Sequence, residues 1–382
     1  MRVGLAHDYL LVVRGAERTF RQIAACWPKA AIYTLLYDQK VTRDGFPGRA
    51  VHASYLQRLP VRQRGFRRLL PLFPRAVERL RFCDHDVIVS SSSAFAHGIR
   101  PPEGTLHVCY CHTPFRYVWH ARQQALDEFP WWARPMGAHL LDRIRAWDIE
   151  AARRVDHYIA NSEITRARIA EFWGREATVL HPPVETDRFR IGVPEDFFLV
   201  VSELVSHKRV DTALEAARQT GQKLKVVGTG PSLARLHARY GDRADFLGRV
   251  DDRGLADLMA RARAVVVPSV EEFGIVAVEA QAAGRPVLAP DRGGTKETVL
   301  DGKTGVLYPS GDDDALADAM RHVDFSGFEP LELRRHALRF RPEAFRERLV
   351  REVERLARGG RTSQPRPGTG RKNQVELSVP GS

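Results

Sequence analysis

The sequence predicts an α/β protein in which two doubly wound domains face each other across a cleft. The chain has 382 residues, a length that suits two domains, each with its own core. Short runs rich in valine and isoleucine alternate with longer amphipathic stretches, which implies parallel sheets covered by helices on both faces. A stretch containing proline and arginine at residues 189–194 has no periodicity and marks a boundary between the halves.

Six short apolar runs have the composition of buried strands. They lie at residues 87–89, 155–160, 197–201, 224–227, 264–267 and 286–289. Helical periodicity fills the gaps, as at residues 211–219 and 254–263. Sheets of this kind bind ligands at the carboxyl ends of their strands, so residues that directly follow a strand are the candidate site residues.

The chain divides into four expected parts. Residues 1–190 and 191–340 form the two Rossmann-like domains, and residues 341–358 form an amphipathic helix that packs back toward the first domain. Residues 359–382 combine Gly, Ser, Pro and basic residues without an apolar period, which predicts a disordered tail.

Composition excludes several classes of protein. Hydrophobic residues make up 43% and charged residues 28%, which is ordinary for a globular protein. The four cysteines are too few for a disulfide scaffold, and Cys109-x-Cys111 lacks the spacing of a zinc site. There is no start resembling a signal peptide and no apolar run of about 18 residues, so we expect a cytoplasmic protein without a membrane span.

The net charge of +12 indicates an anionic partner. Residues 58–81 contain eight arginines and one acid, Glu78, interleaved with apolar side chains. This mixture favours contact with an anionic membrane surface; the alternative is a solvated helix pair that packs its apolar face on the domain, with prolines preventing one long helix. No aromatic RNA-binding signature accompanies the charge, so no nucleic-acid partner is expected. The candidate membrane contacts are Arg62, Arg64, Arg67 and Arg68.

The strongest local pattern lies at residues 268–280. The segment reads Pro-Ser-Val-Glu-Glu-Phe-Gly-Ile-Val-Ala-Val-Glu-Ala and follows an expected strand. Glu271 and Glu279 bracket a Phe-Gly turn, and a helix that starts near Gly274 would direct them at different parts of one bound molecule. Carboxylates accept paired hydrogen bonds from the hydroxyls of sugars and ribose. Without the turn and the neighbouring motifs, two such glutamates would be interpreted as solvated surface.

This segment resembles the Glu-x7-Glu motif of the retaining glycosyltransferases of family 4, which have the two-domain GT-B fold. Four further segments resemble that family in the expected order, at residues 201–211, 227–231, 246–248 and 293–297. In the first half, four segments are close to bacterial polysaccharide mannosyltransferases, at residues 1–17, 109–117, 161–162 and 181–184. The resemblance covers roughly residues 1–358.

The resemblance implies a role for each motif residue. Glu271, with backbone amides around Phe273 and Gly274, would hold hydroxyls of the donor sugar, and Glu279 would hold the ribose. Lys208 would neutralise the departing diphosphate, assisted by helix N-terminal amides in place of a metal.

Other implied contacts come from both domains. Gly15 would let the loop after the first strand approach the phosphates closely. His112 ends an apolar run and would contact the sugar as a positioning residue. The remaining donor-binding candidates are Arg209, Gly293, Gly294 and Thr295. Three further histidines could line the cleft or be ordinary polar residues, namely His7, His97 and His181.

Two positions depart from the family pattern. Glu203 stands where the family usually has an arginine, so one cation of the diphosphate site is missing from its usual place. Arg209 or Arg292 could replace that cation. Arg14, where many relatives have a glycine, could crowd the loop or supply the missing charge.

Asp84 and Asp86 form a D-x-D pair, which is a metal-diphosphate clamp in a different glycosyltransferase fold. They precede the expected strand at residues 87–89 and so lie at its amino end, the wrong edge for a ligand site. We therefore expect no metal ion and no cofactor.

The resemblance implies a retaining transferase that moves a hexosyl residue from a nucleotide sugar to a saccharide or lipid-linked acceptor. The first domain would bind the acceptor and the second the donor, with GDP-mannose as the first choice and a UDP-sugar as the other. Such an enzyme would serve cell-surface polysaccharide or glycolipid synthesis at the inner face of the plasma membrane. A sugar-nucleotide epimerase and a non-catalytic saccharide-binding scaffold are the alternatives.

Overall fold

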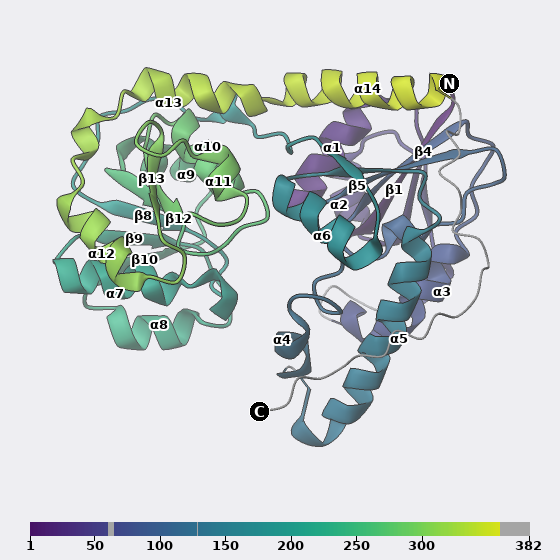
Figure 1. Ribbon diagram of the computed structural model, residues 1–382, viewed down its shortest axis with the longest axis horizontal. Helices are drawn as coiled ribbons and strands as arrows, with labels where there is room; N and C mark the ends of the chain where they lie inside the picture. The colour runs from purple at the N-terminus through teal and green to yellow at the C-terminus, as the bar shows by residue number, and fades with distance from the viewer. Residues whose placement is uncertain (60–64, 128, 360–382) are drawn as a thin grey trace.

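The computed structural model describes residues 1–59, 65–127 and 129–359. Each half of the chain contains one sheet whose strand pairings are all parallel, with helices packed around it (Figure 1). The strand order is β3-β2-β1-β4-β5-β6-β7 in the first sheet and β10-β9-β8-β11-β12-β13 in the second. The predicted fold class, two doubly wound α/β domains, is confirmed.

The strands are short and mostly buried, as expected for parallel strands that are covered on both faces. The first sheet contains β1 (Val3–Leu10), β2 (Ile32–Tyr37), β3 (Val51–Ala53), β4 (Val87–Ser92), β5 (Leu106–Cys111), β6 (His157–Ala160) and β7 (Ala177–Val179). The second contains β8 (Phe198–Val201), β9 (Leu224–Val227), β10 (Ala244–Gly248), β11 (Ala264–Val266), β12 (Val287–Pro290) and β13 (Gly305–Tyr308).

The helices connect successive strands. Those of the first half are α1 (Gly15–Cys26), α2 (Gln39–Gly45), α3 (Phe73–Glu78), α4 (Arg122–Asp127), α5 (Arg134–Ala152) and α6 (Glu163–Trp173). Those of the second are α7 (Val210–Thr220), α8 (Leu233–Tyr240), α9 (Asp252–Arg261), α10 (Ile275–Ala282), α11 (Thr295–Thr298), α12 (Asp313–His322), α13 (Pro330–Ala337) and α14 (Pro342–Arg358). Short 3₁₀ helices are η1 (Tyr55–Arg58), η2 (Phe66–Leu72), η3 (Ala96–Gly98), η4 (Trp131–Ala133), η5 (Thr186–Arg188), η6 (Ser206–Lys208), η7 (Phe325–Gly327) and η8 (Leu338–Phe340).

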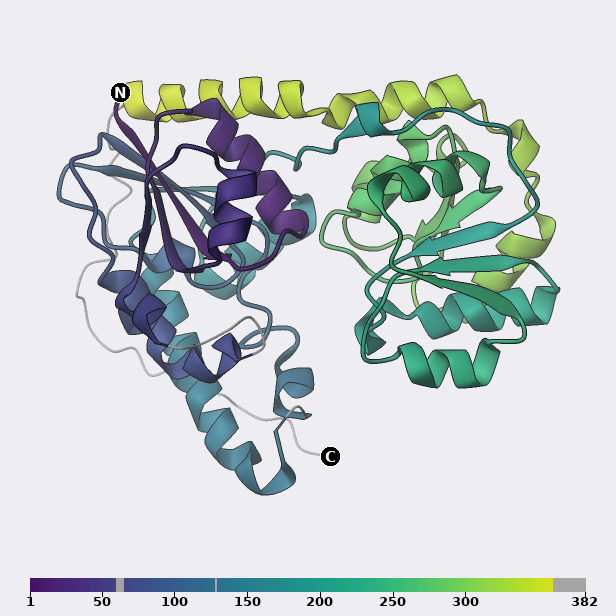
Figure 2. The ribbon, with the colours of Figure 1, turned by 180° about the vertical axis from the view of Figure 1, so that it is seen from behind.

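Helix α14 returns to the first domain. It starts beside the second domain and runs along one edge of the molecule to the first (Figures 1 and 2). Its buried side chains recur at a helical spacing and join the core around β1 and α1. They are Phe345, Leu349, Val353 and Leu356.

The arginine-rich segment forms short helices, because Pro71 lies inside η2 and Pro74 in the first turn of α3. Several of its apolar side chains, such as Leu69 and Phe73, are buried in the domain core, whereas Leu59 and Leu72 are 41% and 43% exposed. Arg68 is exposed. Arg62 and Arg64 lie outside the described residues, as do the side chain of Arg67 and the tail from residue 360 onward.

Candidate active site

A cavity of about 440 Å³ lies between the two domains. In each sheet the strand order reverses at the centre, between β1 and β4 and between β8 and β11, and the loops that follow these strands open toward this cavity. Its polar lining includes Ser93, His112, Thr113, Arg116, Asn161, Glu203, Lys208, Ser269, Glu271 and Glu272. The carboxyl ends of both sheets therefore meet at one site, as the topology requires.

Glu271 and Lys208 form the charged centre of the second-domain wall. Lys208 Nζ lies 2.8 Å and 2.6 Å from the two carboxylate oxygens of Glu271. Ser269 Oγ donates a hydrogen bond to Glu271 Oε1 at 2.5 Å. Lys208 ends η6, and Glu271 follows β11, so two loops from neighbouring strands bring the groups together.

Glycines shape the turn that carries Glu271. Gly274 is the N-cap residue of α10 and has φ 89°, a left-handed conformation that disfavours residues with a Cβ atom. A Cβ atom at Gly294 would lie 2.2 Å from Phe273 Cα, and Gly294 N donates to Glu271 O at 2.7 Å. The backbone of Gly293 and Gly294 thus packs closely against the turn that carries Glu271.

His112 directly follows β5 and lines the cavity from the first domain. Its Nε2 lies 2.9 Å from Ser91 Oγ, and His7 Nδ1 lies 3.1 Å from the same oxygen. Burial, with a smaller contribution from His7, lowers the pKa of His112 to about 3. His112 is therefore neutral near pH 7, so it can exchange a hydrogen bond with a hydroxyl but adds no positive charge.

Glu279 lies apart from this cavity. It is 6% exposed, and burial raises its pKa to about 7 despite the nearby charges of Arg18 and Arg188. Arg18 Nη1 lies 4.0 Å from Glu279 Oε1. Arg18 also lines a second, more open hollow of about 910 Å³, together with Arg249 and Asp252. The two glutamates of the motif therefore do not line one cavity.

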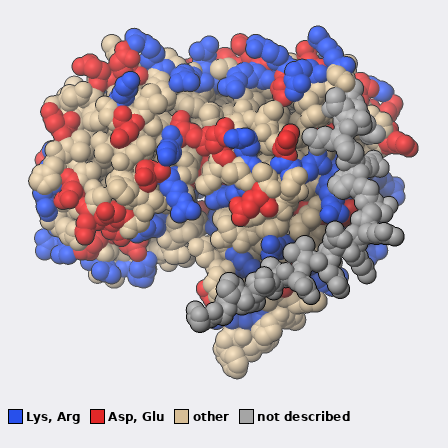
Figure 3. All heavy atoms as spheres, viewed as in Figure 1, with Lys and Arg blue, Asp and Glu red and all other residues tan. Residues whose placement is uncertain are grey.

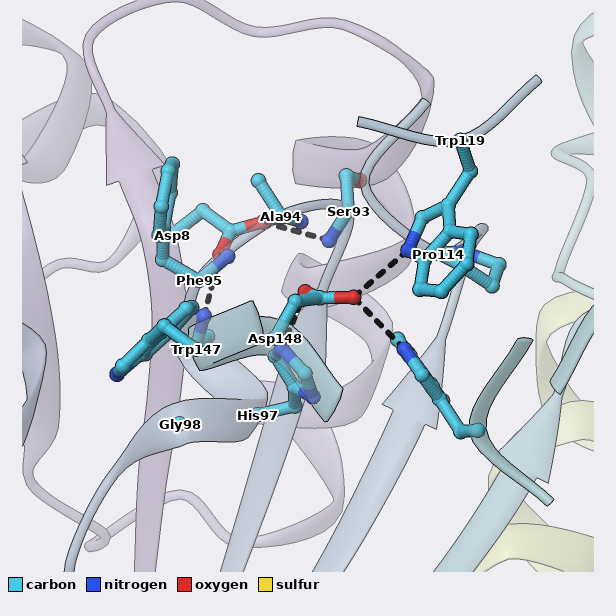
Figure 4. Close-up of polar contacts among 12 residues, drawn as sticks. Asp8, Ser93, Ala94, Phe95, His97, Gly98, Pro114, Trp119, Trp147 and Asp148 are labelled. Atoms are coloured by element: carbon cyan, nitrogen blue, oxygen red, sulfur yellow. Dashed lines mark hydrogen bonds and ion pairs between the residues drawn. The ribbon is translucent and has the colours of Figure 1, made fainter. Parts of the chain in front are cut away.

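A buried carboxylate fixes the loop that supplies Ser93. Asp8 is 4% exposed and accepts four backbone N–H groups, those of residues 93–96, at 2.6 to 3.1 Å. Figure 4 shows Ser93, Ala94 and Phe95 beside the Asp8 carboxylate. Such a set of bonds compensates the cost of burying a charge and holds the loop after β4 in place.

A second buried carboxylate, Asp148 on α5, anchors the loop after β5. It accepts from His97 Nε2 at 3.0 Å, from Trp119 Nε1 at 2.8 Å and from Trp173 Nε1 at 2.7 Å (Figure 4). Trp119 lies in the loop that begins after β5 and also contains His112 and Arg116. His97 thus acts inside the domain and does not line the cavity.

Several polar contacts join the domains around the cavity. Arg14 Nη1 lies 3.4 Å from Glu203 Oε2. Arg168 lies 3.3 Å from Glu272, and the carboxylate of Glu297 accepts the backbone N–H of residue 163 at 2.9 Å. Burial opposes ionisation of Glu272, but Arg168 and Lys208 outweigh it and lower the pKa of that carboxyl.

The structure brings six of the predicted donor-site residues to the cavity wall: Gly15, His112, Lys208, Glu271, Phe273 and Gly274. Five others do not line it: Arg209, Glu279, Gly293, Gly294 and Thr295. His7 and His181 do not line it either.

Two of the residues away from the cavity have other partners. Arg209 has a left-handed backbone, φ 49°, which turns the chain between η6 and α7, and its guanidinium lies 2.6 Å from Asp313. Thr295 is fully buried, and its hydroxyl donates within the loop to Pro290 O at 3.1 Å. Both side chains are occupied by these partners and lie outside the cavity wall, so their positions do not favour contact with a ligand at the Lys208–Glu271 pair.

Arg116 and Glu272 also line the cavity. Both lie in segments that carry the family resemblance, residues 109–117 and 268–280, but neither was predicted to be a site residue. Arg116 Nη2 lies 3.3 Å from His207 Nε2 across the domain interface. Its position in the sequence indicates a site residue, because Arg116 lies four residues after His112 in a loop that follows a strand.

Asp84 and Asp86 lie at the amino end of β4, as predicted, where both contact the Arg2 side chain at 2.8 and 3.3 Å. Within residues 1–59, 65–127 and 129–359, no group of three or more His, Cys, Asp and Glu side chains could hold a metal ion. The same residues contain no helix with the length and hydropathy needed to cross a membrane.

Two family models match the chain. The model described as Glycosyltransferase Family 4 matches residues 13–188, and the model described as Glycosyl transferases group 1 matches residues 184–324.

Curated relatives match over part of their length. The D-inositol 3-phosphate glycosyltransferase of Streptomyces avermitilis is 33% identical over 211 residues, which are 46% of this chain and 45% of that protein. The phosphatidyl-myo-inositol mannosyltransferase of Mycobacterium leprae is 43% identical over 103 residues, 26% of this chain and 27% of that protein. The matched part of this chain thus spans less than half the length of these relatives.

Solved structures are similar over nearly the whole chain. Anabaena HepE, solved in complex with UDP, has a TM-score of 0.68 and 19% identity, with 93% of this chain and 100% of that chain covered. Sucrose-phosphate synthase from Thermosynechococcus elongatus has a TM-score of 0.69 and 18% identity at the same coverage of both chains. This likeness shows the GT-B fold. Because the two family models together span residues 13–324, the chain belongs to glycosyltransferase family 4.

Proposed function

We propose that this protein is a retaining glycosyltransferase that transfers a hexosyl residue from a nucleotide sugar. The observation that carries the proposal is the Lys208–Glu271 pair, 2.6 Å apart, in a cavity between the domains and beside the start of α10. A lysine and helix N-terminal amides suit a diphosphate, and a carboxylate suits sugar hydroxyls. A diphosphate at Lys208 would lie within reach of a hexose bound at Glu271.

In the proposed reaction, the bond between C1 of the hexose and the diphosphate oxygen breaks while the acceptor oxygen bonds to C1 on the same face. The acceptor proton passes to the departing phosphate oxygen. Lys208 and the first amides of α10 would stabilise the negative charge that develops on the diphosphate. Neutral His112 would orient a sugar hydroxyl from the opposite wall.

The first-choice donor is GDP-mannose, and a UDP-sugar is the alternative. One relative named as a mannosyltransferase favours mannose, whereas HepE was solved with UDP and with UDP-glucose. The acceptor is proposed to be a saccharide or a lipid-linked acceptor bound by the first domain, which contributes Ser93, Arg116 and Asn161 to the cavity.

Calorimetric titration in EDTA with UDP, GDP, ADP and their sugars tests this proposal. One nucleotide should bind tightly, and Lys208→Ala should weaken it by at least about tenfold, since a hydrogen bond to a charged group contributes about 1.5–3 kcal/mol. Lys303→Ala removes the same charge from an exposed position and should leave affinity unchanged. Binding of none of the nucleotides would refute the transferase proposal and favour a saccharide-binding scaffold.

Product analysis separates transfer from epimerisation. With donor and a saccharide acceptor, the wild type should form a glycosidic bond with retained configuration, and Glu271→Ala should abolish it. Glu176→Ala, an exposed glutamate, is the matched control. Release of an epimerised sugar without acceptor would identify an epimerase instead.

A further inference from the structure

The first domain carries a projecting pair of helices with an exposed apolar end. Helix α4 and the start of α5 extend away from the body of the domain in both ribbon views (Figures 1 and 2). At the end, Trp131, Trp132 and Met136 are 80%, 67% and 68% exposed. Tryptophan is highly buried on average, so two adjacent exposed tryptophans mark an interaction site. We call these three residues the apolar tip.

The apolar tip lies apart from the packed face of α5. Buried positions begin with Ala133, just before the helix, and Gly137, against which Phe129 packs, and they continue with Leu141 and Ile144. Met136 and Arg143 are exposed and lie seven residues apart, so they share one face of α5, and Trp132 in η4 directly precedes that helix. This face changes from apolar at the tip to basic nearer the domain.

Exposed basic side chains lie on the segments at the base of the projection. Segment η2–α3 packs against α5, since Trp147 Nε1 donates to Glu78 Oε1 at 2.8 Å and both segments share one core. Four arginines are exposed, one on η2, one on α3, one directly after α3 and one on α5, and none of them forms an ion pair with a described residue. We call them the basic collar: Arg68, Arg75, Arg79 and Arg143. In Figure 3 the lowest part of the projection is free of charged atoms on the face shown, and basic atoms lie above it.

We propose that the apolar tip inserts into the interface of an anionic phospholipid bilayer while the basic collar contacts lipid phosphates. Tryptophan suits this boundary, because its ring is apolar and its N–H can bond to head groups or water. Exposed arginines that form no ion pair with a described residue are attracted to an anionic surface and hold phosphate oxygens by charge-assisted bonds. This charge complementarity favours a lipid surface over an apolar protein partner.

This proposal goes beyond the transferase proposal and rests on the surface alone. Of the four arginines singled out by the sequence, one, Arg68, belongs to the collar. The apolar tip lies more than fifty residues further along the chain. Vesicle binding is measured without donor or acceptor, so failure of either proposal can be recognised separately.

The test is flotation of the full chain with vesicles of phosphatidylcholine, alone or mixed with phosphatidylglycerol. The wild type should bind the anionic vesicles, and Trp131→Ala with Trp132→Ala should reduce partitioning by about tenfold or more, given the apolar area removed from the bilayer. Val193→Ala with Leu331→Ala is the matched control, since these exposed apolar residues, 82% and 69%, lie in the second half of the chain. Both pairs are exposed, so folding should be preserved.

The charge contribution has its own variants. Changing Arg68, Arg75 and Arg79 to Gln should weaken binding to anionic vesicles by roughly tenfold, and added salt should do the same. The matched control changes three exposed arginines elsewhere, Arg235, Arg339 and Arg351, to Gln. Brominated lipids should quench tryptophan fluorescence in the wild type and not in the double tryptophan variant.

Three results would overturn the proposal. One is a wild type that does not bind anionic vesicles, and another is unchanged partitioning of the double tryptophan variant. The third is self-association of the wild type in sedimentation that the tryptophan changes abolish, without vesicle binding. That last result would identify the tip as an interface between copies of this chain.

Discussion

Glu279 combines a buried position with a carboxyl pKa of about 7. The family resemblance assigns the ribose to Glu279, and because Glu279 lies outside the main cavity, the ribose would have to extend beyond that cavity to reach it. In this role the ionised carboxylate accepts ribose hydroxyls, so the affinity for the sugar nucleotide should rise by about tenfold as pH increases through 7. Calorimetry across pH 5.5 to 8.5 would measure this change. A sugar nucleotide is the right ligand, because its diphosphate has no group that titrates in this range. Glu279→Gln should flatten the profile, and a rise that persists in this variant would contradict the assigned role.

The same pKa predicts a stability change without ligand. The native pKa of Glu279 is raised above its ordinary value of 4.5. Protonation of this carboxyl therefore contributes its full amount to the free energy of unfolding below pH 4.5, and this contribution is lost as pH rises through 7. Glu279→Gln should therefore resist urea better than the wild type above pH 7, by about 1–3 kcal/mol. Equal stability of the two proteins at pH 8 would indicate that the carboxyl ionises freely.

Two buried histidines predict sensitivity to acid. Burial is the main reason that His107 and His112 have pKa values near 3, against about 6.5 in an unfolded chain. Between pH 6.5 and 3 these histidines are protonated in the unfolded state but neutral in the native state. The free energy of unfolding should therefore fall as pH drops through this range, by up to about 1.4 kcal/mol per pH unit for each histidine. His112→Gln should reduce this slope in urea titrations, whereas the exposed His139→Gln should not.

At the scale of elements, the turn before α10 depends on the glycines behind it. Gly294→Ala would place a Cβ atom 2.2 Å from Phe273 Cα, so the turn carrying Glu271 must shift. We expect a loss of about 1–3 kcal/mol in unfolding free energy and a lower affinity for the nucleotide. Gly327→Ala is the matched control, because a Cβ atom there meets nothing within 4 Å. Normal nucleotide affinity in Gly294→Ala would show that the turn geometry is not limiting.

At the scale of the whole molecule, α14 packs the end of the described chain against the first domain. Leu349 is fully buried in the core that includes β1 and α1. Leu349→Ala should cost about 2–5 kcal/mol and lower the melting temperature of the first domain in calorimetry. Leu331→Ala removes the same side chain from a site that is 69% exposed and should change stability by less than about 0.5 kcal/mol. Equal effects of the two changes would mean that α14 does not stabilise the first domain.

Much of the fold could be predicted because its signals are local. The apolar runs at residues 224–227 and 286–289 correspond to the strands β9 and β12 within one residue at each end, and the run at residues 87–89 begins β4, which continues to Ser92. The strands β3 and β7 were not predicted, because each has only three residues and lies at an edge of its sheet. Such short strands take their conformation from the neighbouring strand more than from their own composition.

The sequence by itself determined the doubly wound fold and the placement of Lys208, His112 and Glu271 after strand ends, because periodicity and motif order are properties of neighbouring residues. The tertiary structure decided that Glu279 lies outside the main cavity and that Arg14 meets Glu203 between the domains. It also decided which apolar side chains remain exposed at the apolar tip. These features depend on contacts between residues far apart in the chain, and no local pattern carries that information.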